Sequence, residues 1–364
     1  SSNCEYCYLQ DAGRQEIPWR KVYVNLGTME DEIQKEYLVF RFANALWCAL
    51  SFYLEKTLPK IPEGFKEIVN EFRNKVLAKN SIIISDAAVK NYLKDSLANH
   101  FLTLVGSIDN KKKLDAIKEN VVTYYNENLK MKLWLTISEY YDLVRVNHIT
   151  NNLAYLMNLI SSNKELRFSI YTKSVAIDNL LNYNGHNRVK FTICLNTDEM
   201  ITKYEHNTSS LEERFDAFNK LQKKAKGYLL RAAIEPIIAY PGFEDDYKLL
   251  AQRMVKELDL GASNVEKIKF GCLRIGPQLR PRIESNHPGT KLFTENQMLY
   301  PVVAPDTKFR YSEDVRLKIY RILLSEFGQF RPKLSLACEY PSIWDKLNII
   351  YKDHMKSYIY QWPG

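Results

Sequence analysis

Residues 189–195 read Val-Lys-Phe-Thr-Ile-Cys-Leu, a short apolar run, and a stretch with helical spacing, Ser210–Lys226, follows it. The same succession recurs through the second half of the chain. The other apolar runs are Leu133–Ser138, Leu166–Tyr171, Tyr228–Ile234 and Ile268–Ile275, and the other helical stretches are Asn152–Ser161, Val175–Leu181, Asp245–Leu258 and Glu313–Phe327. Strands that alternate with helices form parallel sheets buried on both faces. We therefore expect an α/β fold whose parallel sheet is closed, or partly closed, by outer helices. Five strands are visible, and a six-stranded barrel needs one more, which we place before Cys4.

The first part of the chain has a different texture. Ser1–Trp19 has the pattern of a loop and Lys21–Leu26 that of a short strand, whereas apolar residues recur at helical spacing from Asp31 to Lys130. This pattern predicts an all-helical segment. We expect four parts, with the bounds 1–30, 31–130, 131–345 and a C-terminal tail at 346–364.

The composition is that of a globular protein with a basic balance. Hydrophobic residues make up 46% of the 364 residues, enough for a sizeable core. No apolar run approaches the ~18 residues of a membrane span, and the polar start lacks a signal-peptide pattern, so we expect a cytoplasmic protein with no membrane partner. Six cysteines are too few for a disulfide scaffold. The net charge of +8 permits a nucleic-acid partner without requiring one.

Two cysteines stand close together at the start of the chain, in Cys4-Glu5-Tyr6-Cys7. A C-x2-C pair fits half a zinc site, a redox dithiol or part of an iron–sulfur site. A zinc knuckle needs a second Cys or His pair, and the sequence has none at the required spacing. Because soft thiolate ligands select zinc or iron–sulfur clusters, we expect a thiolate metal site.

The segment Cys4-Glu5-Tyr6-Cys7-Tyr8-Leu9-Gln10 resembles the cluster loop of the spore photoproduct lyase family, within the radical S-adenosylmethionine (SAM) superfamily. That loop runs C-x3-C-x2-C, with an aromatic before its last cysteine and Tyr-Leu-Gln after it. Cys4 and Cys7 match the second and third cysteines. We expect the first cysteine, and the first barrel strand before it, immediately upstream of Ser1.

Further segments resemble the same family. They are Phe168–Lys173, Asn184–Val189, Cys194–Asn196, Glu205–Arg214, Pro236–Ile237 and Asn286–Leu292. The resemblance implies a partial (β/α)6 TIM-like barrel of radical SAM type, with a helical insertion at 31–130. It also implies an enzyme, lyase-like, in which a [4Fe–4S] cluster and SAM yield a 5′-deoxyadenosyl radical that abstracts hydrogen from the substrate. An external electron donor of flavodoxin or ferredoxin type would reduce the cluster.

The resemblance assigns roles to individual residues. Cys4 and Cys7 would ligate the cluster, and Lys173 would pair with the SAM carboxylate unless it is a solvated lysine that starts a helix. Tyr6 and Tyr8 would lie beside SAM and relay a radical, or else pack as a shield around the cluster.

Three more residues would line the SAM site: Asp142, Cys194 and Asn196. Asp142 would reach the ribose or the amine of SAM. Cys194 stands where the family more often has a small hydroxyl residue, so it is either a substitute contact or part of the core.

One departure from the family bears on the reaction. Glu139-Tyr140-Tyr141-Asp142 stands where spore photoproduct lyases have Cys-Thr-Ser-Asp, whose thiol returns a hydrogen atom to the product radical. Glu139 has no weak S–H bond to give. Either Tyr140 or Tyr141 serves as the donor, or the reaction is a different one.

A basic loop offers contacts to phosphates through Arg274, Arg280 and Arg282, unless it is merely solvated. The leading interpretation is a radical SAM enzyme that acts on a nucleic-acid lesion, as in DNA repair, or on a related substrate. The first alternative is a radical SAM enzyme that modifies a peptide or small molecule. The second is a degenerate, non-catalytic binding protein.

Overall fold

The structure is a computed structural model, and the chain in it divides into two compact units. One comprises Ser1–Val24 and Trp134–Tyr351, and the other Asn25–Leu133 and Lys352–Gly364. The residues that the structure describes are 3, 4, 6, 38, 39, 41–43, 45, 46, 49, 64–74, 87, 91, 92, 111–127, 134–137, 142–164, 166–277, 279–295, 299–301 and 308–349. The four-part division expected from the sequence stays a prediction.

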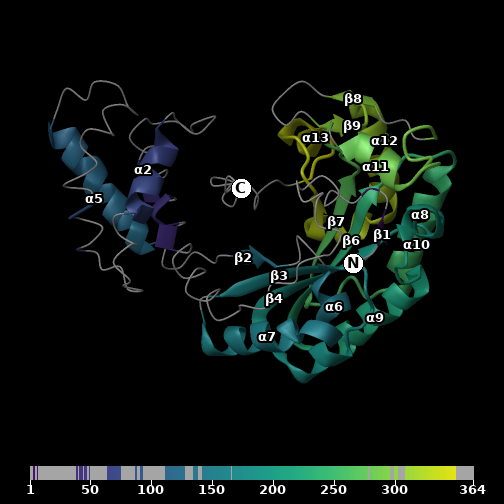
Figure 1. Cartoon of the computed structure of the whole chain (residues 1–364), viewed down its shortest axis with the longest axis horizontal. Coiled ribbons are helices and arrows are strands. Elements are labelled where there is room, and N and C mark those ends of the chain that lie inside the picture. Colours follow the sequence, from purple (N-terminus) through teal and green to yellow (C-terminus); the bar gives the residue numbers. More distant parts are fainter. Residues whose placement is uncertain are drawn as a thin grey trace. The chain divides into compact units, whose positions relative to one another are not determined.

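The first unit is built on a parallel sheet of six strands that curves into a half-barrel (Figure 1). In spatial order the strands are β10 (Leu334–Leu336), β7 (Val265–Cys272), β6 (Lys226–Ile237), β4 (Asn184–Leu195), β3 (Arg167–Thr172) and β2 (Trp134–Thr136). The parallel α/β half-barrel expected from the sequence is confirmed. The sheet has a sixth strand, β10, that was not expected from the sequence. Its three residues are too few to show a periodic pattern. The strand expected before Cys4 stays a prediction.

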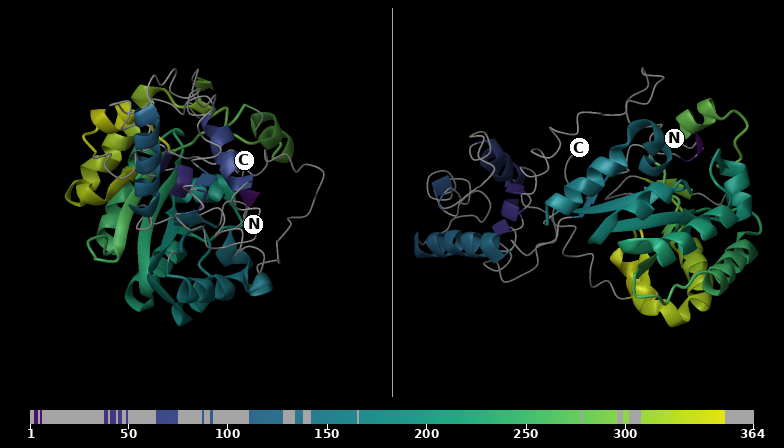
Figure 2. Two further views of the ribbon diagram at one scale, coloured as in Figure 1. Left: turned by 90° about the vertical axis from the view of Figure 1, so that its left-hand side faces the viewer. Right: turned by 90° about the horizontal axis from the view of Figure 1, so that it is seen from below.

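The two faces of the sheet differ in chemistry. On β4, Val189, Phe191, Ile193 and Leu195 are completely or almost completely buried. Helices α6 (Leu143–Thr150), α7 (Asn152–Ser162) and α9 (Leu211–Lys224) pack on β3 and β4, on the outer side of the curved sheet (Figure 2). The alternate positions, which include Lys190, face the inner side because side chains alternate along a strand. The inner face is therefore where polar side chains gather.

Local signals account for the helix starts. Ser210 and Glu213 form a reciprocal capping box at the start of α9, and Ser312 caps α12 (Glu313–Glu326). Helix α10 (Phe243–Glu257) begins after Gly242, whose φ of 87° favours glycine, and acidic residues occupy its first turn. The helix expected at Val175–Leu181 is instead a 3₁₀ helix, η4 (Asp178–Asn182), because β4 begins two residues later and leaves no room for a longer helix.

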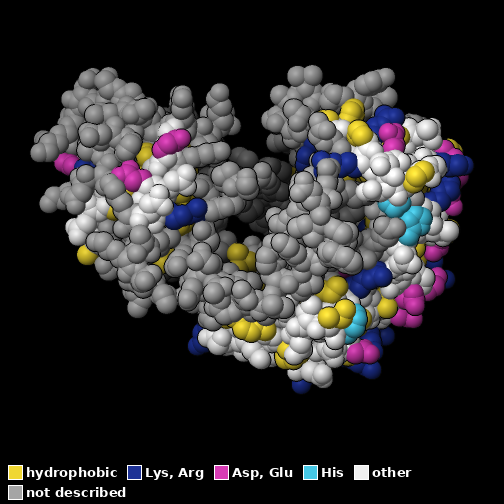
Figure 3. All heavy atoms as spheres, viewed as in Figure 1, with side chains coloured by type: hydrophobic (Ala, Val, Ile, Leu, Met, Phe, Trp, Pro, Cys, Tyr) yellow, Lys and Arg dark blue, Asp and Glu magenta, His cyan; other side chains and the backbone are white. Residues whose placement is uncertain are grey.

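The remaining elements of this unit are short. They are β1 (Asn3–Cys4), α8 (Asp198–Tyr204), β5 (Glu205–His206), α11 (Leu279–Asn286), β8 (Leu299–Pro301), β9 (Phe309–Arg310), η5 (Gly328–Lys333) and α13 (Pro341–Lys346). β1 pairs with β5, and β8 with β9, both antiparallel. Acidic and basic side chains lie intermixed over α8 and α10, on the face seen in Figure 3.

The second unit contains α2 (Phe65–Phe72) and α5 (Lys111–Glu127). The rings of Phe42 and Phe72 stack with centroids 3.9 Å apart, and Tyr92 meets both rings edge-on. These side chains are buried, so the described helical residues form a local apolar core. Among the described residues of the whole chain, none of the helices has the length and apolarity needed to cross a bilayer.

Candidate functional site

Three segments distant in sequence meet at the carboxyl end of the sheet. β3 and β4 pair from Phe168 and Val189 up to Thr172 and Ile193, so Lys173, which follows β3, comes next to the end of β4. The N-terminal segment joins them through β1, in which Cys4 lies directly opposite Glu205. Cys4 and Glu205 are both buried.

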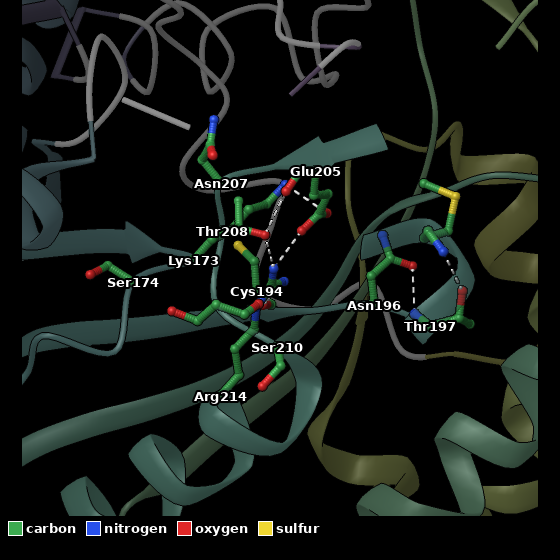
Figure 4. Close-up of polar contacts among 12 residues, drawn as sticks. Lys173, Ser174, Cys194, Asn196, Thr197, Glu205, Asn207, Thr208, Ser210 and Arg214 are labelled. Carbon is green, nitrogen blue, oxygen red and sulfur yellow. Dashed lines mark hydrogen bonds and ion pairs between the residues drawn. The ribbon is translucent and has the colours of Figure 1, made fainter. Parts of the chain in front are cut away.

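The Glu205 carboxylate is the centre of the polar contacts here. Its Oε1 accepts hydrogen bonds from the Tyr6 hydroxyl and from Lys173 Nζ, the latter at 2.9 Å. Its Oε2 accepts from Arg214 Nη2 at 2.6 Å. Lys173 Nζ also donates to the Tyr6 hydroxyl at 2.6 Å and lies 4.7 Å from the centre of the Tyr6 ring. The approach of Lys173, Glu205 and Arg214 is visible in Figure 4.

Arg214 is held in place by the residues before its own helix and by β4. Its Nε donates to the Ser209 carbonyl at 2.9 Å, its Nη1 to the Cys194 carbonyl at 3.0 Å, and its Nη2 also to Thr208 Oγ1 at 2.7 Å. The guanidinium is completely buried. Because a fixed, buried cation needs a counter-charge, Arg214 and Glu205 stabilise each other.

The surroundings fix the protonation of these groups. Burial favours a higher pKa for Glu205, but Lys173 and Arg214 outweigh it and lower the pKa to about 2. Burial favours a lower pKa for Lys173, yet Glu205 and then Cys4 raise it above its usual value. Burial and Glu205 raise the pKa of Tyr6 well above its usual value. At neutral pH the group is therefore an ammonium, a carboxylate, a guanidinium and a neutral phenol, with two cations facing one anion.

Cys194 contributes a thiol to the same end of the sheet. Its side chain lies near Lys173 (Figure 4). Burial raises the pKa of the Cys194 thiol to about 12, although Lys173 opposes the shift. Cys194 therefore carries its proton at neutral pH.

Asp142 acts on the backbone of this site. Its carboxylate accepts from Arg145 N at 3.2 Å and so caps α6. It also accepts from Thr172 Oγ1 at 2.7 Å and from Lys173 N at 3.0 Å. Asp142 thus fixes the end of β3, from which the Lys173 side chain extends. Its predicted contact with SAM stays a prediction.

Asn196 lies apart from the Lys173 group, next to Thr197 (Figure 4). It is fully buried, donates to the Pro236 carbonyl at 2.9 Å, and accepts from Thr197 N and from the Tyr247 hydroxyl. These contacts tie the end of β4 to β6 and α10. Its role toward SAM also stays a prediction.

Other predicted site residues are placed elsewhere or not described. Cys7, Tyr8, Glu139, Tyr140 and Tyr141 lie outside the described residues. Arg274, Arg280 and Arg282 lie in and just before α11, where Arg280 forms an exposed ion pair with Glu284 at 3.0 Å. Exposed pairs of this kind are weak. The predicted contacts of the three arginines with phosphates stay predictions.

The described residues contain no group of three or more Cys, His, Asp or Glu side chains arranged to hold a metal ion. Cys4 by itself fits a thiolate ligand, because it is buried and lies near enough to Lys173 to raise the pKa of that ammonium. A nearby cation stabilises the thiolate that a cluster requires. The donor set of the Cys4–Cys7 loop therefore fits an iron–sulfur cluster better than a hard cation.

Sequence reasoning brought Cys4, Tyr6, Lys173 and Cys194 into one site, and the structure places them together. The sequence did not predict Glu205 or Arg214 as site residues. The signal available was that both belong to the family-like segment Glu205–Arg214. Only the fold determines which side chains of that segment point inward.

The fold indicates the superfamily to which the chain belongs. A parallel half-barrel with Cys4 at its carboxyl edge matches the partial barrel of radical SAM proteins. The family model for spore photoproduct lyase matches residues 106–334. The chain belongs to the spore photoproduct lyase family.

Curated relatives and solved structures agree with this assignment. The chain is similar to the spore photoproduct lyases of Geobacillus sp. (strain Y412MC61), 29% identical over 154 residues, and of Bacillus subtilis (strain 168), 26% identical over 151 residues. Each match covers 42% of this chain and 44% of the relative, so the chain matches less than half the length of these relatives.

Two solved structures of spore photoproduct lyase variants share the fold. One, with a dinucleoside spore photoproduct, has a TM-score of 0.51 at 23% identity and covers 61% of this chain and 66% of that one. The other, with bound AdoMet and the dinucleoside, has a TM-score of 0.50 at 18% identity and covers 76% of this chain and 94% of that one.

Proposed function

We propose that this protein is a radical SAM enzyme, cytoplasmic and lyase-like, that acts on a nucleic-acid lesion. The observation that carries the proposal is the buried pairing of Cys4 with Glu205, which brings the cysteine loop beside Lys173. Family membership supplies the reaction class. A [4Fe–4S] cluster held by Cys4, Cys7 and one further cysteine would supply the electron that cleaves SAM to a 5′-deoxyadenosyl radical. An external donor of flavodoxin or ferredoxin type would provide that electron.

The residues of the chain prepare the site for an anionic ligand. Lys173 is charged, and its ammonium sits in a group with more positive than negative charge, which favours the carboxylate of SAM. Burial strengthens this attraction because water screens it less. Asp142 fixes the backbone of Lys173, and the neutral hydroxyl of Tyr6 helps to aim the ammonium. Water exclusion protects reactive species at such a site.

A nucleic-acid substrate accords with the net charge of +8 and with Arg274, Arg280 and Arg282, which we propose contact phosphates. Two of the structural neighbours hold a dinucleoside spore photoproduct. A second candidate, modification of a peptide or small molecule, is favoured by Glu139, which replaces the thiol of the family. The two differ in whether damaged DNA stimulates the reaction.

The cofactor test uses the full-length protein, reconstituted with iron and sulfide without oxygen. We expect a reduced-cluster EPR signal that changes when SAM is added, together with formation of 5′-deoxyadenosine. Cys4→Ala abolishes both. A protein that takes up no cluster, or one whose signal ignores SAM, would overturn the proposal and leave a binding protein with a radical SAM fold.

The substrate test compares ultraviolet-irradiated with unirradiated DNA in the same assay. We expect irradiated DNA to raise deoxyadenosine formation, and the binding of DNA to weaken steeply with salt. Equal rates with both DNAs, and no salt-dependent binding, would exclude a nucleic-acid lesion and favour the peptide or small-molecule substrate.

A further inference from the structure

Glu205 is a buried carboxylate to which sequence reasoning gave no role. Its side chain is completely buried, and its two oxygens accept from three donors that come from three separate parts of the chain. Tyr6 lies 199 residues away in sequence and Lys173 lies 32 away. A carboxylate with this set of partners connects the cysteine loop to the barrel.

We propose that Glu205 is a positioning residue that holds the cysteine loop and Lys173 in register with each other. This inference rests on the proposed function, since it assigns a task within the same site. Glu205 holds the loop twice: its backbone pairs with Cys4, and its Oε1 accepts from the Tyr6 hydroxyl two residues further on. The same oxygen holds Lys173. Glu205 Oε1 therefore sets the distance between the N-terminal segment and the ammonium, together with the direct hydrogen bond from Lys173 to the Tyr6 hydroxyl.

Arg214 allows Glu205 to remain ionised in this place. A lone buried carboxylate would take up a proton, and a protonated Glu205 would lose most of its attraction for Lys173. Arg214 occupies Oε2 and leaves Oε1 for Tyr6 and Lys173. Since Arg214 is itself fixed by Ser209, Thr208 and the end of β4, the carboxylate cannot turn without breaking contacts.

The chain offers a matched control for a Glu205 variant. Glu339 also accepts from a tyrosine, the Tyr320 hydroxyl at 2.9 Å, and from an arginine, Arg316. Its side chain is 2% exposed, and both of these partners belong to α12, which is not part of the Lys173 group. Glu339→Gln therefore imposes the same loss of a buried charge without touching the cysteine loop.

The experiment measures alkylation of Cys4 in the full-length, cluster-free protein, resolved by peptide mass spectrometry. We expect Glu205→Gln to speed Cys4 alkylation at least fivefold and Glu339→Gln to leave it within twofold of the wild type. In the loaded enzyme, Glu205→Gln should raise the KM for SAM about tenfold with a smaller effect on kcat. Glu205→Asp, which keeps the charge, should recover part of both losses.

Equal alkylation in Glu205→Gln and Glu339→Gln would overturn the proposal, because loss of buried charge alone would then explain the effect. If Glu205→Gln does not fold, Tyr6→Phe decides, since it removes the hydroxyl that donates to Glu205 and accepts from Lys173. Unchanged Cys4 alkylation in that variant would also overturn the proposal. The alkylation test needs neither cluster nor SAM. A protein that passes it but never cleaves SAM would contradict the proposed function and not the positioning role.

Discussion

The ammonium of Lys190 lies 3.7 Å from the centre of the Trp134 ring, although β3 separates their strands. On its other side Lys190 contacts Glu266 of β7 at 3.1 Å, and Arg231 shares that carboxylate at 2.6 Å. The contacts thus reach across the inner face of the half-barrel from β2 to β7. Two cations share one carboxylate there, and this has a measurable consequence.

Lys190 should react with amine reagents at an unusually low pH. Burial, followed by Arg231, lowers its pKa to about 8, although Glu266 opposes the shift. Lys269 is a matched control on the same face with similar exposure, 19% against 12%, but burial there is outweighed by Glu235 and its pKa is raised. We expect Lys190 to be half-maximally acetylated near pH 8 and Lys269 well above it. Acetylation that depends on pH in the same way at Lys190 and Lys269, as measured by mass spectrometry, would contradict this prediction.

The same shift affects stability with a definite sign. Between the folded pKa of about 8 and the usual value of 10.5, the unfolded chain binds more protons at Lys190 than the folded chain does. Stability from this group therefore rises with pH across that window, by up to about 1.4 kcal/mol per unit. We expect the free energy of urea unfolding of wild type, relative to Lys190→Met, to increase from pH 8 to pH 10. If the difference in unfolding free energy between wild type and Lys190→Met falls as the pH rises, the prediction is wrong.

Lys173→Ala should weaken SAM binding to the cluster-loaded protein. Loss of one buried, charge-assisted contact costs about 1.5–3 kcal/mol, or roughly 10- to 150-fold in Kd. Lys318→Ala is the control, since Lys318 also forms an ion pair, with Glu244, but is exposed at the surface. Equilibrium dialysis with labelled SAM gives both constants. Similar Kd values of the two variants for SAM would show that Lys173 does not contact SAM.

Cys194 should resist alkylation in the folded protein. Burial holds its pKa at about 12, so at pH 8 it presents almost no thiolate, and reagents cannot reach it. Cys338 is exposed and serves as the internal reference. We expect iodoacetamide to label Cys338 rapidly and Cys194 only after unfolding in urea. Labelling of both at one rate would place Cys194 at an open surface.

Ser210→Ala should destabilise the protein by about 0.5–2 kcal/mol, the usual cost of losing an N-cap. Ser210 belongs to the capping box with Glu213, directly before Arg214. Ser312→Ala removes a simple cap from α12 and controls for the general effect. We expect both to lower stability in urea, and Ser210→Ala alone to speed Cys4 alkylation. Equal rates of Cys4 alkylation in the two variants would show that the Ser210 cap does not affect the position of Cys4.

Hydrophobic pattern made most of the sheet predictable. Each of the five strands expected is short and rich in apolar residues, as in Val189–Leu195, and has a stretch with helical spacing close to it. β10 has only Leu334–Leu336 and was missed. The segment after Lys173 has apolar residues that suggested an α-helix, but the position of the next strand limits it to a 3₁₀ helix of five residues.

The site was predictable in part for a different reason. Cys4, Tyr6 and Lys173 were found because a short loop motif and a strand end resemble a family. Arg214 was not, because a charge beside Glu212 and Glu213 in an amphipathic helix has the pattern of a solvated face. Glu205 was not, because it lies in β5, a strand of two residues. Only the ladder between β1 and β5 shows that Glu205 is inside, and two-residue strands leave no trace in sequence.

The first turn of α9 starts the helix and also places the Arg214 side chain at the end of β4. Each added residue turns a helix by about 100°. A one-residue insertion between Ser210 and Arg214 would therefore leave α9 intact while swinging the guanidinium away from the end of β4. Homologous sequences should accordingly tolerate length changes in other connections of the half-barrel and keep this one constant. An alignment that spans it offers a record of which relatives preserved the site and which kept only the fold.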